Sequence, residues 1–200
     1  MNRVDRARNI IVQPKQEWKL IADEATTPAE LYQEYILPLA AIGPAATLIG
    51  GSLVGIRLPM GTYRVPIGAS VVYAVASYGL TVLGVYVLGL IINALAPNFS
   101  AQKDPVQALK VAAYSSTPGW LAGVFALVPA LSILGVLGGL YGLYLVYLGL
   151  VALMRPAEEQ SLSYTAVVVV CAVLIFFVIG ALCGAFLPAP ALALPGPHPL

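Results

Sequence analysis

The sequence predicts an all-α integral membrane protein, a five-transmembrane-helix bundle with a short N-terminal interfacial arm. Hydrophobic residues make up 60% of the 200-residue chain and charged residues only 10%, whereas soluble domains average about 25% charged residues. The hydrophobic residues gather in runs long enough to cross a ~30 Å hydrocarbon layer, which takes roughly 20 helical residues. Nearly all charged residues lie between these runs.

Residues 1–34 are expected to form a cytoplasmic arm at the membrane surface. The arm mixes Trp18 and aliphatic residues with five basic residues, a composition that suits a short helix in the headgroup region. The alternative is an arm that docks on another protein. Thr27 and Glu30 flank Pro28-Ala29 in the pattern of a capping box, which predicts that a helix begins at Pro28.

Residues 35–187 are expected to form the membrane domain, followed by a proline-rich tail, 188–200. The five spans are predicted at about 35–56, 66–95, 108–129, 131–154 and 164–187. With the N-terminus in the cytoplasm, eight Lys and Arg residues fall inside and two outside, as the positive-inside rule requires. A re-entrant third segment changes the count only to seven against three, so charge leaves open whether 108–129 spans the membrane.

The fourth span sorts its small and aromatic residues onto opposite faces. Its glycines allow another helix to approach closely, which predicts that this helix lies at the centre of the bundle. The packing residues are Gly135, Gly138, Gly142 and Gly149. The tyrosines on the opposite face lie near mid-span, so their hydroxyl groups need partners inside the protein or a wet cavity.

A polar patch with a proline, Ala113 to Trp120, interrupts the third segment. It predicts either a discontinuous helix of the kind that forms midplane binding sites, or a kinked span whose hydroxyl groups repair the broken hydrogen bonds. Lys110 is close enough to reach into the patch, although snorkelling to the headgroups is its alternative role. The candidate ligand or lipid cavity comprises Lys110, Tyr114, Ser115, Ser116, Thr117, Trp120, Tyr141 and Tyr144.

The sequence offers no residues for familiar catalytic chemistry. No Asp or Glu falls within a predicted span, and the single histidine, His198, lies in the tail. There is no metal-ligand spacing, no nucleophile paired with a base and no phosphate-binding loop, so we expect no enzyme, no metal and no cofactor. The basic residues are scattered without a recognised binding motif, which argues against nucleic acid as a partner.

Three motifs in order carry a family resemblance: Pro14-Lys15-Gln16-Glu17-Trp18-Lys19-Leu20-Ile21, Ala113-Tyr114-Ser115-Ser116-Thr117-Pro118 and Tyr141-Gly142-Leu143-Tyr144-Leu145. On these motifs the sequence resembles the bacterial branch of the Yip (Ypt/Rab-interacting protein) domain family. The resemblance implies five membrane helices, a cytoplasmic N-terminus, and a place in the bacterial cytoplasmic (inner) membrane. Eukaryotic members are associated with Rab GTPases through a longer N-terminal region. The short arm does not match that region, so a small GTPase partner is not carried over, and the family supplies no catalytic residues.

The leading hypothesis is a non-enzymatic scaffold or accessory subunit whose partners are the lipid bilayer and either further copies of itself or a larger membrane complex. The alternative is a transporter or lipid-binding protein with a neutral, tyrosine-lined site at the broken third helix. A third hypothesis is membrane remodelling by insertion of the N-terminal arm.

Overall fold

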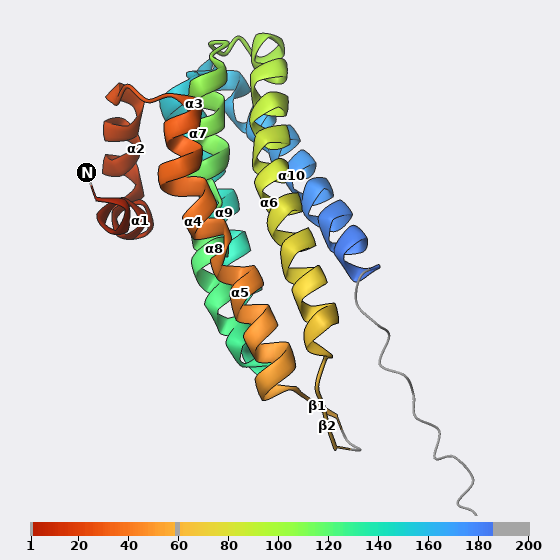
Figure 1. The fold of residues 1–200 in the computed structure, drawn as a ribbon. Coiled ribbons are helices and arrows are strands. Elements are labelled where there is room, and N and C mark those ends of the chain that lie inside the picture. Colours follow the sequence, from red (N-terminus) through yellow and green to blue (C-terminus); the bar gives the residue numbers. More distant parts are fainter. Residues whose placement is uncertain (1, 59–60, 186–200) are drawn as a thin grey trace, which may run out of the picture.

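A computed structural model describes residues 2–58 and 61–185 of the chain. Long helices run side by side, a two-stranded hairpin lies at one end, and two short N-terminal helices pack against one side (Figure 1). The predicted tail, 188–200, and the last two residues of the predicted span 164–187 lie outside the described residues.

The first long helix runs from Pro28 to Val54 as a series of short segments. These are α3 (Pro28–Leu31), η1 (Tyr32–Ile36), α4 (Leu37–Ala40), α5 (Ile42–Ile49) and η2 (Gly50–Val54), of which η1 and η2 are π-helical. The predicted capping box is confirmed, because Thr27 Oγ1 accepts a hydrogen bond from Glu30 N at 3.2 Å while the Glu30 carboxylate accepts one from Thr27 N at 2.9 Å. Pro38 and Pro44 lack the N–H of a regular helix, which accounts for the interruptions on either side of α4.

A short hairpin connects the first two long helices. Strand β1 (Ile56–Leu58) pairs antiparallel with β2 (Gly61–Tyr63). Helix α6 (Ile67–Leu95) follows with 29 residues and continues as the 3-10 turn η3 (Ala96–Phe99). At 1.5 Å per residue α6 is about 44 Å long, which exceeds the hydrocarbon thickness and requires tilt or protrusion.

The third apolar segment consists of three short helices. They are α7 (Pro105–Ser115), α8 (Thr117–Ala122) and η4 (Gly123–Leu127), and only Ser116 separates the first two. Asp104 caps α7, since its Oδ1 accepts hydrogen bonds from Val106 N at 2.8 Å and from Gln107 N at 3.0 Å.

The last part of the chain adds two long helices. The 3-10 turn η5 (Pro129–Leu131) precedes α9 (Leu134–Gly149), which continues as the π-helical turn η6 (Leu150–Met154). The 3-10 turn η7 (Glu158–Gln160) then leads into α10 (Ser161–Gly184).

The predicted helical membrane fold is confirmed, apart from the short hairpin. Within the described residues, four helices are long and apolar enough to cross a membrane: Pro28–Val54, Ile67–Phe99, Pro129–Met154 and Glu158–Gly184. The predicted span 108–129 does not form a fifth helix of this kind, because the break at Ser116 divides it. The predicted count of five is therefore not confirmed, since the part of the chain that the structure describes contains four such helices.

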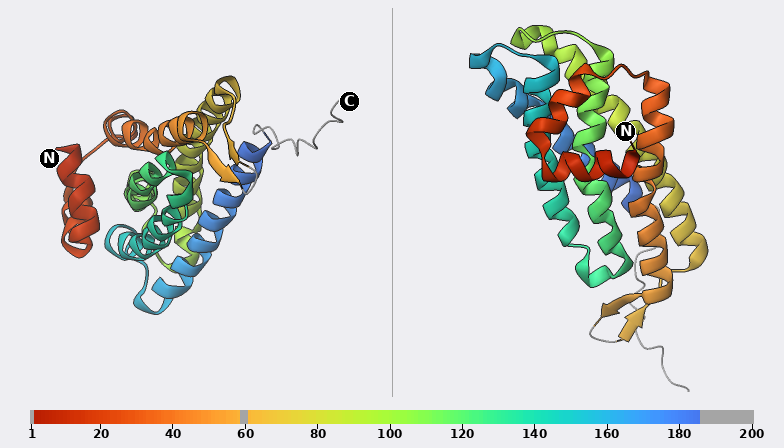
Figure 2. Two further views of the ribbon diagram at one scale, coloured as in Figure 1. Left: turned by 90° about the horizontal axis from the view of Figure 1, so that it is seen from below. Right: turned by 90° about the vertical axis from the view of Figure 1, so that its left-hand side faces the viewer.

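The arm consists of α1 (Arg3–Val12) and α2 (Pro14–Asp23). Helix α1 runs across the long helices. The chain then turns at Gln13, and α2 runs along the long helices (Figures 1 and 2). Pro14 occupies the first position of α2, where a proline is tolerated because the missing N–H has no helical partner. The arm packs on the chain's own helices, with α1 against α8 and α2 against α9 and η6.

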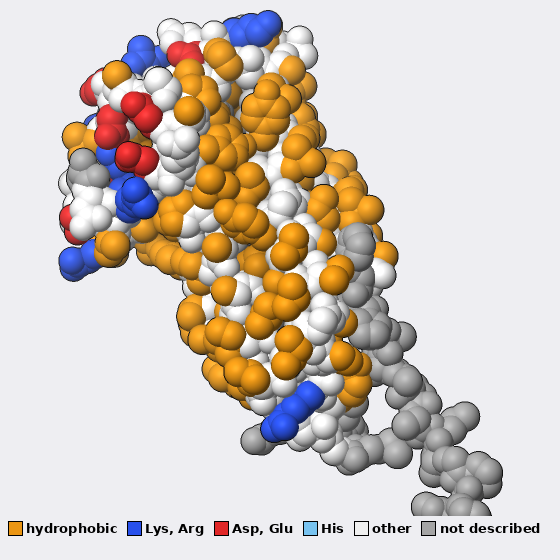
Figure 3. All heavy atoms as spheres, in the orientation of Figure 1, with side chains coloured by type: hydrophobic (Ala, Val, Ile, Leu, Met, Phe, Trp, Pro, Cys, Tyr) orange, Lys and Arg blue, Asp and Glu red, His pale blue; other side chains and the backbone are white. Residues whose placement is uncertain are grey.

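The surface has polar ends and an apolar middle. On the face drawn in Figure 3, charged side chains gather over the arm, basic atoms mark the hairpin end, and hydrophobic side chains cover the length between them. Helix α10 exposes Leu174, Phe176, Phe177 and Val178. Such a face suits contact with lipid tails, which are as apolar as the side chains themselves.

Candidate functional site: the junction between the arm and the helices

The two arm helices bury the same pattern of residues. Arg6, Ala7 and Ile10 of α1 are buried, and so are Glu17, Trp18 and Ile21 of α2. Both sets occupy positions n, n+1 and n+4, which lie on one side of a helix. Each arm helix thus turns two apolar side chains and one charged side chain toward the bundle, and the two charges are opposite.

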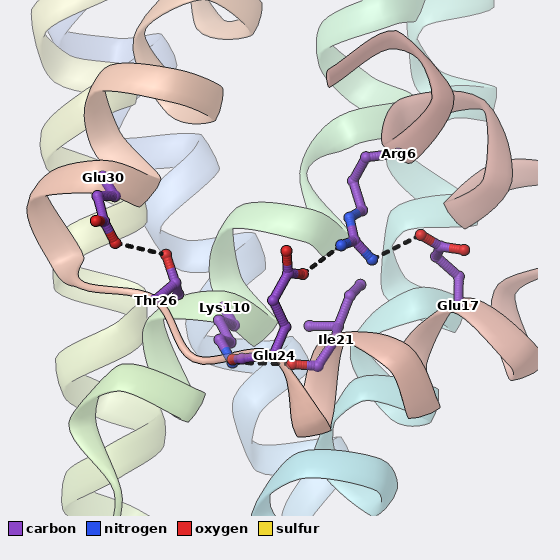
Figure 4. A network of polar contacts seen from close by, with 7 residues as sticks. All are labelled: Arg6, Glu17, Ile21, Glu24, Thr26, Glu30 and Lys110. Atoms are coloured by element: carbon purple, nitrogen blue, oxygen red, sulfur yellow. Dashed lines mark hydrogen bonds and ion pairs between the residues drawn. The ribbon is translucent and has the colours of Figure 1, made fainter. Parts of the chain in front are cut away.

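Arg6 forms ion pairs with both ends of α2 (Figure 4). Its Nη1 donates to Glu17 Oε1 at 2.7 Å, and its Nη2 donates to the Glu24 carboxylate. The guanidinium carbon also lies 5.8 Å from the centre of the Tyr114 ring, within the range of a cation–π contact. Because the side chains of Arg6 and Glu17 are almost fully buried, removal of either partner leaves an uncompensated charge in the interior.

Lys110 of α7 binds the C-terminal end of α2. Its Nζ donates to the carbonyl oxygens of Ile21 at 2.8 Å and Glu24 at 2.5 Å (Figure 4). Gln107, one turn earlier on α7, donates through Nε2 to the Ala22 carbonyl at 3.1 Å. The last carbonyls of a helix have no partners within it, so these two side chains satisfy them. Lys110 is 2% exposed and anchors the arm.

Aromatic rings fill the space between the arm and α7. The ring centre of Tyr114 lies 4.6 Å from that of Tyr35 and 6.2 Å from that of Trp18. Trp18 is 1% exposed. Two polar atoms at this junction, Trp18 Nε1 and Ser115 Oγ, are buried without a hydrogen-bond partner.

Hydroxyl groups repair the break between α7 and α8. Ser116 Oγ donates to the Ala112 carbonyl at 2.8 Å. Thr117 Oγ1 and the Tyr35 hydroxyl are 2.8 Å apart and form a buried hydrogen bond between α8 and the first long helix. Trp120 is buried on α8. The polar patch is thus held largely by bonds within the protein.

Tyr141 and Tyr144 of α9 have different surroundings. The Tyr141 hydroxyl donates to the Ile11 carbonyl at 2.8 Å, which fixes the end of α1 to α9. Tyr144 is 42% exposed and, together with residues 13–16, lines a surface hollow of about 310 Å³. The structure therefore brings Lys110, Tyr114 and Tyr141 to the arm and Thr117 to Tyr35, while Tyr144 faces outward.

Three of the four predicted packing glycines lie against neighbouring elements. A Cβ at Gly138 would lie 2.6 Å from the Pro118 carbonyl oxygen, and one at Gly142 would lie 2.8 Å from that of Ser115. A Cβ at Gly149 would lie 2.8 Å from Trp18 Cη2. Gly135 has no such neighbour within 4 Å. The glycine face thus receives both the α7–α8 segment and the arm.

Comparison with known proteins assigns the chain to a family. The model of the Yip1 domain matches residues 8–181. The chain belongs to the Yip1 domain family. The resemblance read from the three motifs is thereby confirmed, and the chain is an integral membrane protein of this family.

Two bacterial proteins are similar to the chain over most of its length. The chain is 29% identical over 173 residues to the inner membrane protein YohC of Escherichia coli strain K12, covering 84% of this chain and 89% of the relative. The same figures hold for YohC of Escherichia coli O6:H1 strain CFT073. No solved structure matches the chain.

The junction contains residues that sequence reasoning did not single out. Glu17, Glu24 and Tyr35 lie within the part matched by the Yip1 model, and Arg6 lies just before it. The same spacing of one charged and two apolar residues recurs in α1 and α2, and this repeat could have indicated the buried side of the arm. Within residues 2–58 and 61–185, no group of three or more His, Cys, Asp or Glu side chains is arranged to hold a metal ion.

Proposed function

We propose that this Yip1-family chain is a non-enzymatic scaffold or accessory subunit of the bacterial cytoplasmic membrane. One observation carries the proposal: Arg6, Glu17 and Lys110, the buried charged side chains of the described residues, all bind partners within the chain. The Arg6–Glu17 pair ties the two arm helices together, and Lys110 holds α2 to α7. These charged groups hold the arm in place and do not serve catalysis. The E. coli relatives are named as inner membrane proteins, which supports the location.

The proposed topology has five spans and a cytoplasmic N-terminus. The count of eight Lys and Arg residues against two supports this orientation. The segment α7–α8–η4 supplies the fifth crossing as a broken helix whose polar groups face other helices and the arm. Fusions of alkaline phosphatase and green fluorescent protein at the hairpin and after Arg155 test it. Phosphatase activity is expected only at the hairpin, and the reverse pattern would refute the orientation.

The glycines of α9 that face outward offer a surface for association. Gly135 and Gly139 are one turn apart, and a Cβ on either would meet nothing within 4 Å. Small residues let a second transmembrane helix approach closely. The proposed scaffold uses this surface to contact another copy or a subunit of a larger complex.

Extraction of the tagged protein in native lipid, followed by mass spectrometry of the material that accompanies it, tests the scaffold function. We expect a stoichiometric protein partner or a homo-oligomer, which Gly135→Leu should weaken. Gly180→Leu on α10 is the matched control, because Gly180 also has no neighbour within 4 Å. A monomer without any protein partner would refute the proposal.

One observation favours a second candidate, a small neutral ligand at the α7–α8 break. Ser115 Oγ is buried there and has no hydrogen-bond partner. Ser115→Ala and Tyr114→Phe should then reduce ligand binding while the protein still folds. Unchanged binding or transport in both variants would exclude this candidate.

A further inference from the structure

The position of α1 sets the height of the membrane surface on one side of the bundle. The hydrogen bond from Tyr141 to Ile11 holds the end of α1 level with the middle of α9, about 20 Å from Met154 at 1.5 Å per residue. The exposed side of the arm carries Arg8, Lys15 and Lys19. Charged side chains are costly in hydrocarbon. Headgroups therefore reach the charged side of the arm and surround the turn between α1 and α2.

The hollow beside Tyr144 lies at this turn. Gln13, Pro14, Lys15 and Gln16 line it from the arm, and Tyr144 lines it from α9. The lining offers an ammonium group, two amide groups and a phenol, all of which donate hydrogen bonds. The next acidic residue on α2, Glu17, is already paired with Arg6, so Lys15 is the charge that faces the hollow.

An apolar stripe leads away from the hollow toward the hairpin end. Leu137 and Leu140 are 62% and 58% exposed, and they precede Tyr144 by seven and four residues, which are helical spacings. They therefore lie on the same face of α9 as Tyr144. Residues on this face below α1 are at the depth of lipid tails. A polar, cationic hollow thus continues into an apolar track.

We infer that the hollow binds the phosphate headgroup of one anionic phospholipid. Lys15 and the amide groups of Gln13 and Gln16 contact the phosphate, the Tyr144 hydroxyl contacts the headgroup, and an acyl chain lies along Leu140 and Leu137. Charge complementarity and the continuous apolar track select a lipid over a soluble anion, because a free phosphate would use only the upper half of the site. This site is separate from the proposed scaffold surface at Gly135 and from the α7–α8 break.

Native mass spectrometry of the delipidated full-length protein in detergent tests the inference. Phosphatidylglycerol is added in one arm, phosphatidylcholine in a second, and phosphatidylglycerol in competition with inorganic phosphate in a third. We expect one phosphatidylglycerol molecule to be retained in preference to phosphatidylcholine, without displacement by phosphate. Lys15→Gln should weaken retention roughly fivefold, the usual effect of one basic residue near anionic lipid.

Two further variants keep the inference falsifiable. Lys19→Gln removes the same charge about one turn along α2, at a residue outside the lining of the hollow, and should leave retention nearly unchanged. Lys15→Arg keeps the positive charge and should retain phosphatidylglycerol as well as the wild type does. Equal losses for Lys15→Gln and Lys19→Gln would show general attraction to a basic arm and overturn the site. Equal retention of both lipids, or displacement by inorganic phosphate, would overturn it as well.

Discussion

The Trp18 indole lies directly on Gly149, with no room for a side chain between α2 and α9. A Cβ at Gly149 would come within 2.8 Å of both Trp18 Cη2 and Trp18 Cζ2. Atoms this close must move apart, and the indole is rigid and 1% exposed. The glycine is therefore a docking position for the arm.

Gly149→Val should displace the arm from α9. Overpacking of a tight contact costs about 1–3 kcal/mol, and Trp18 should become exposed to solvent. In a Trp120→Phe background, which leaves Trp18 as the single indole, the fluorescence emission should shift to longer wavelength. Gly135→Ala is the control, because Gly135 has no neighbour within 4 Å. An unshifted emission in the Gly149 variant would contradict this packing.

The ion pair of Arg6 with Glu17 should respond differently to single and double substitution. Glu17→Met leaves the Arg6 charge without its buried partner, and such losses cost about 3–5 kcal/mol. The double variant Arg6→Met/Glu17→Met removes both charges and should recover most of this loss. Thermal unfolding and limited proteolysis of the arm measure the stability of both variants. A double variant less stable than the Glu17 variant would show that the two side chains act separately.

Lys110→Met should loosen the arm while the membrane helices stay folded. The substitution keeps the apolar stem but leaves the carbonyls of Ile21 and Glu24 without a donor, which costs about 1–3 kcal/mol when they stay buried. Proteolytic cleavage within residues 13–27 should become faster. Lys103→Met, at an exposed lysine in the loop before α7, should leave the cleavage rate unchanged. Equal rates in wild type and Lys110→Met would remove the anchoring role.

Tyr35 and Thr117 should be energetically coupled across the break in the third segment. Tyr35→Phe and Thr117→Val each remove one partner of a buried 2.8 Å hydrogen bond. A net contribution of about 0.5–1.5 kcal/mol is typical of such a bond. A double-mutant cycle on thermal stability should therefore show that the two losses are not additive. Strict additivity would mean that the hydroxyl groups do not stabilise each other.

The sequence predicts the features that depend on local chemistry. The start of the first helix follows from Thr27 and Glu30, whose side chains find backbone groups three residues away. The long apolar runs predict membrane helices because length and hydropathy suffice for that inference. The family resemblance follows from three short motifs that occur in order along the chain.

The attachment of the arm depends on contacts between residues far apart in the chain. The bond between Lys110 and Ile21 joins positions 89 residues apart, and that between Tyr141 and Ile11 joins positions 130 apart. Hydropathy places Lys110 near the end of a span but does not say which carbonyls it meets. Similarly, the polar patch indicates a break in the third helix, whereas its partner Tyr35 comes from another span.

Hydrogen–deuterium exchange of the full-length protein in native lipid tests most directly whether the arm is a docked part of the membrane domain. The amide groups of α1 and α2 should exchange as slowly as those of α7, because Lys110 and Trp18 hold α2 against the bundle and the buried ion pair ties α1 to α2. The Lys110→Met variant should speed exchange in α2 more than in α6. An arm that exchanges as quickly as an unstructured peptide in the wild type would contradict the docked junction.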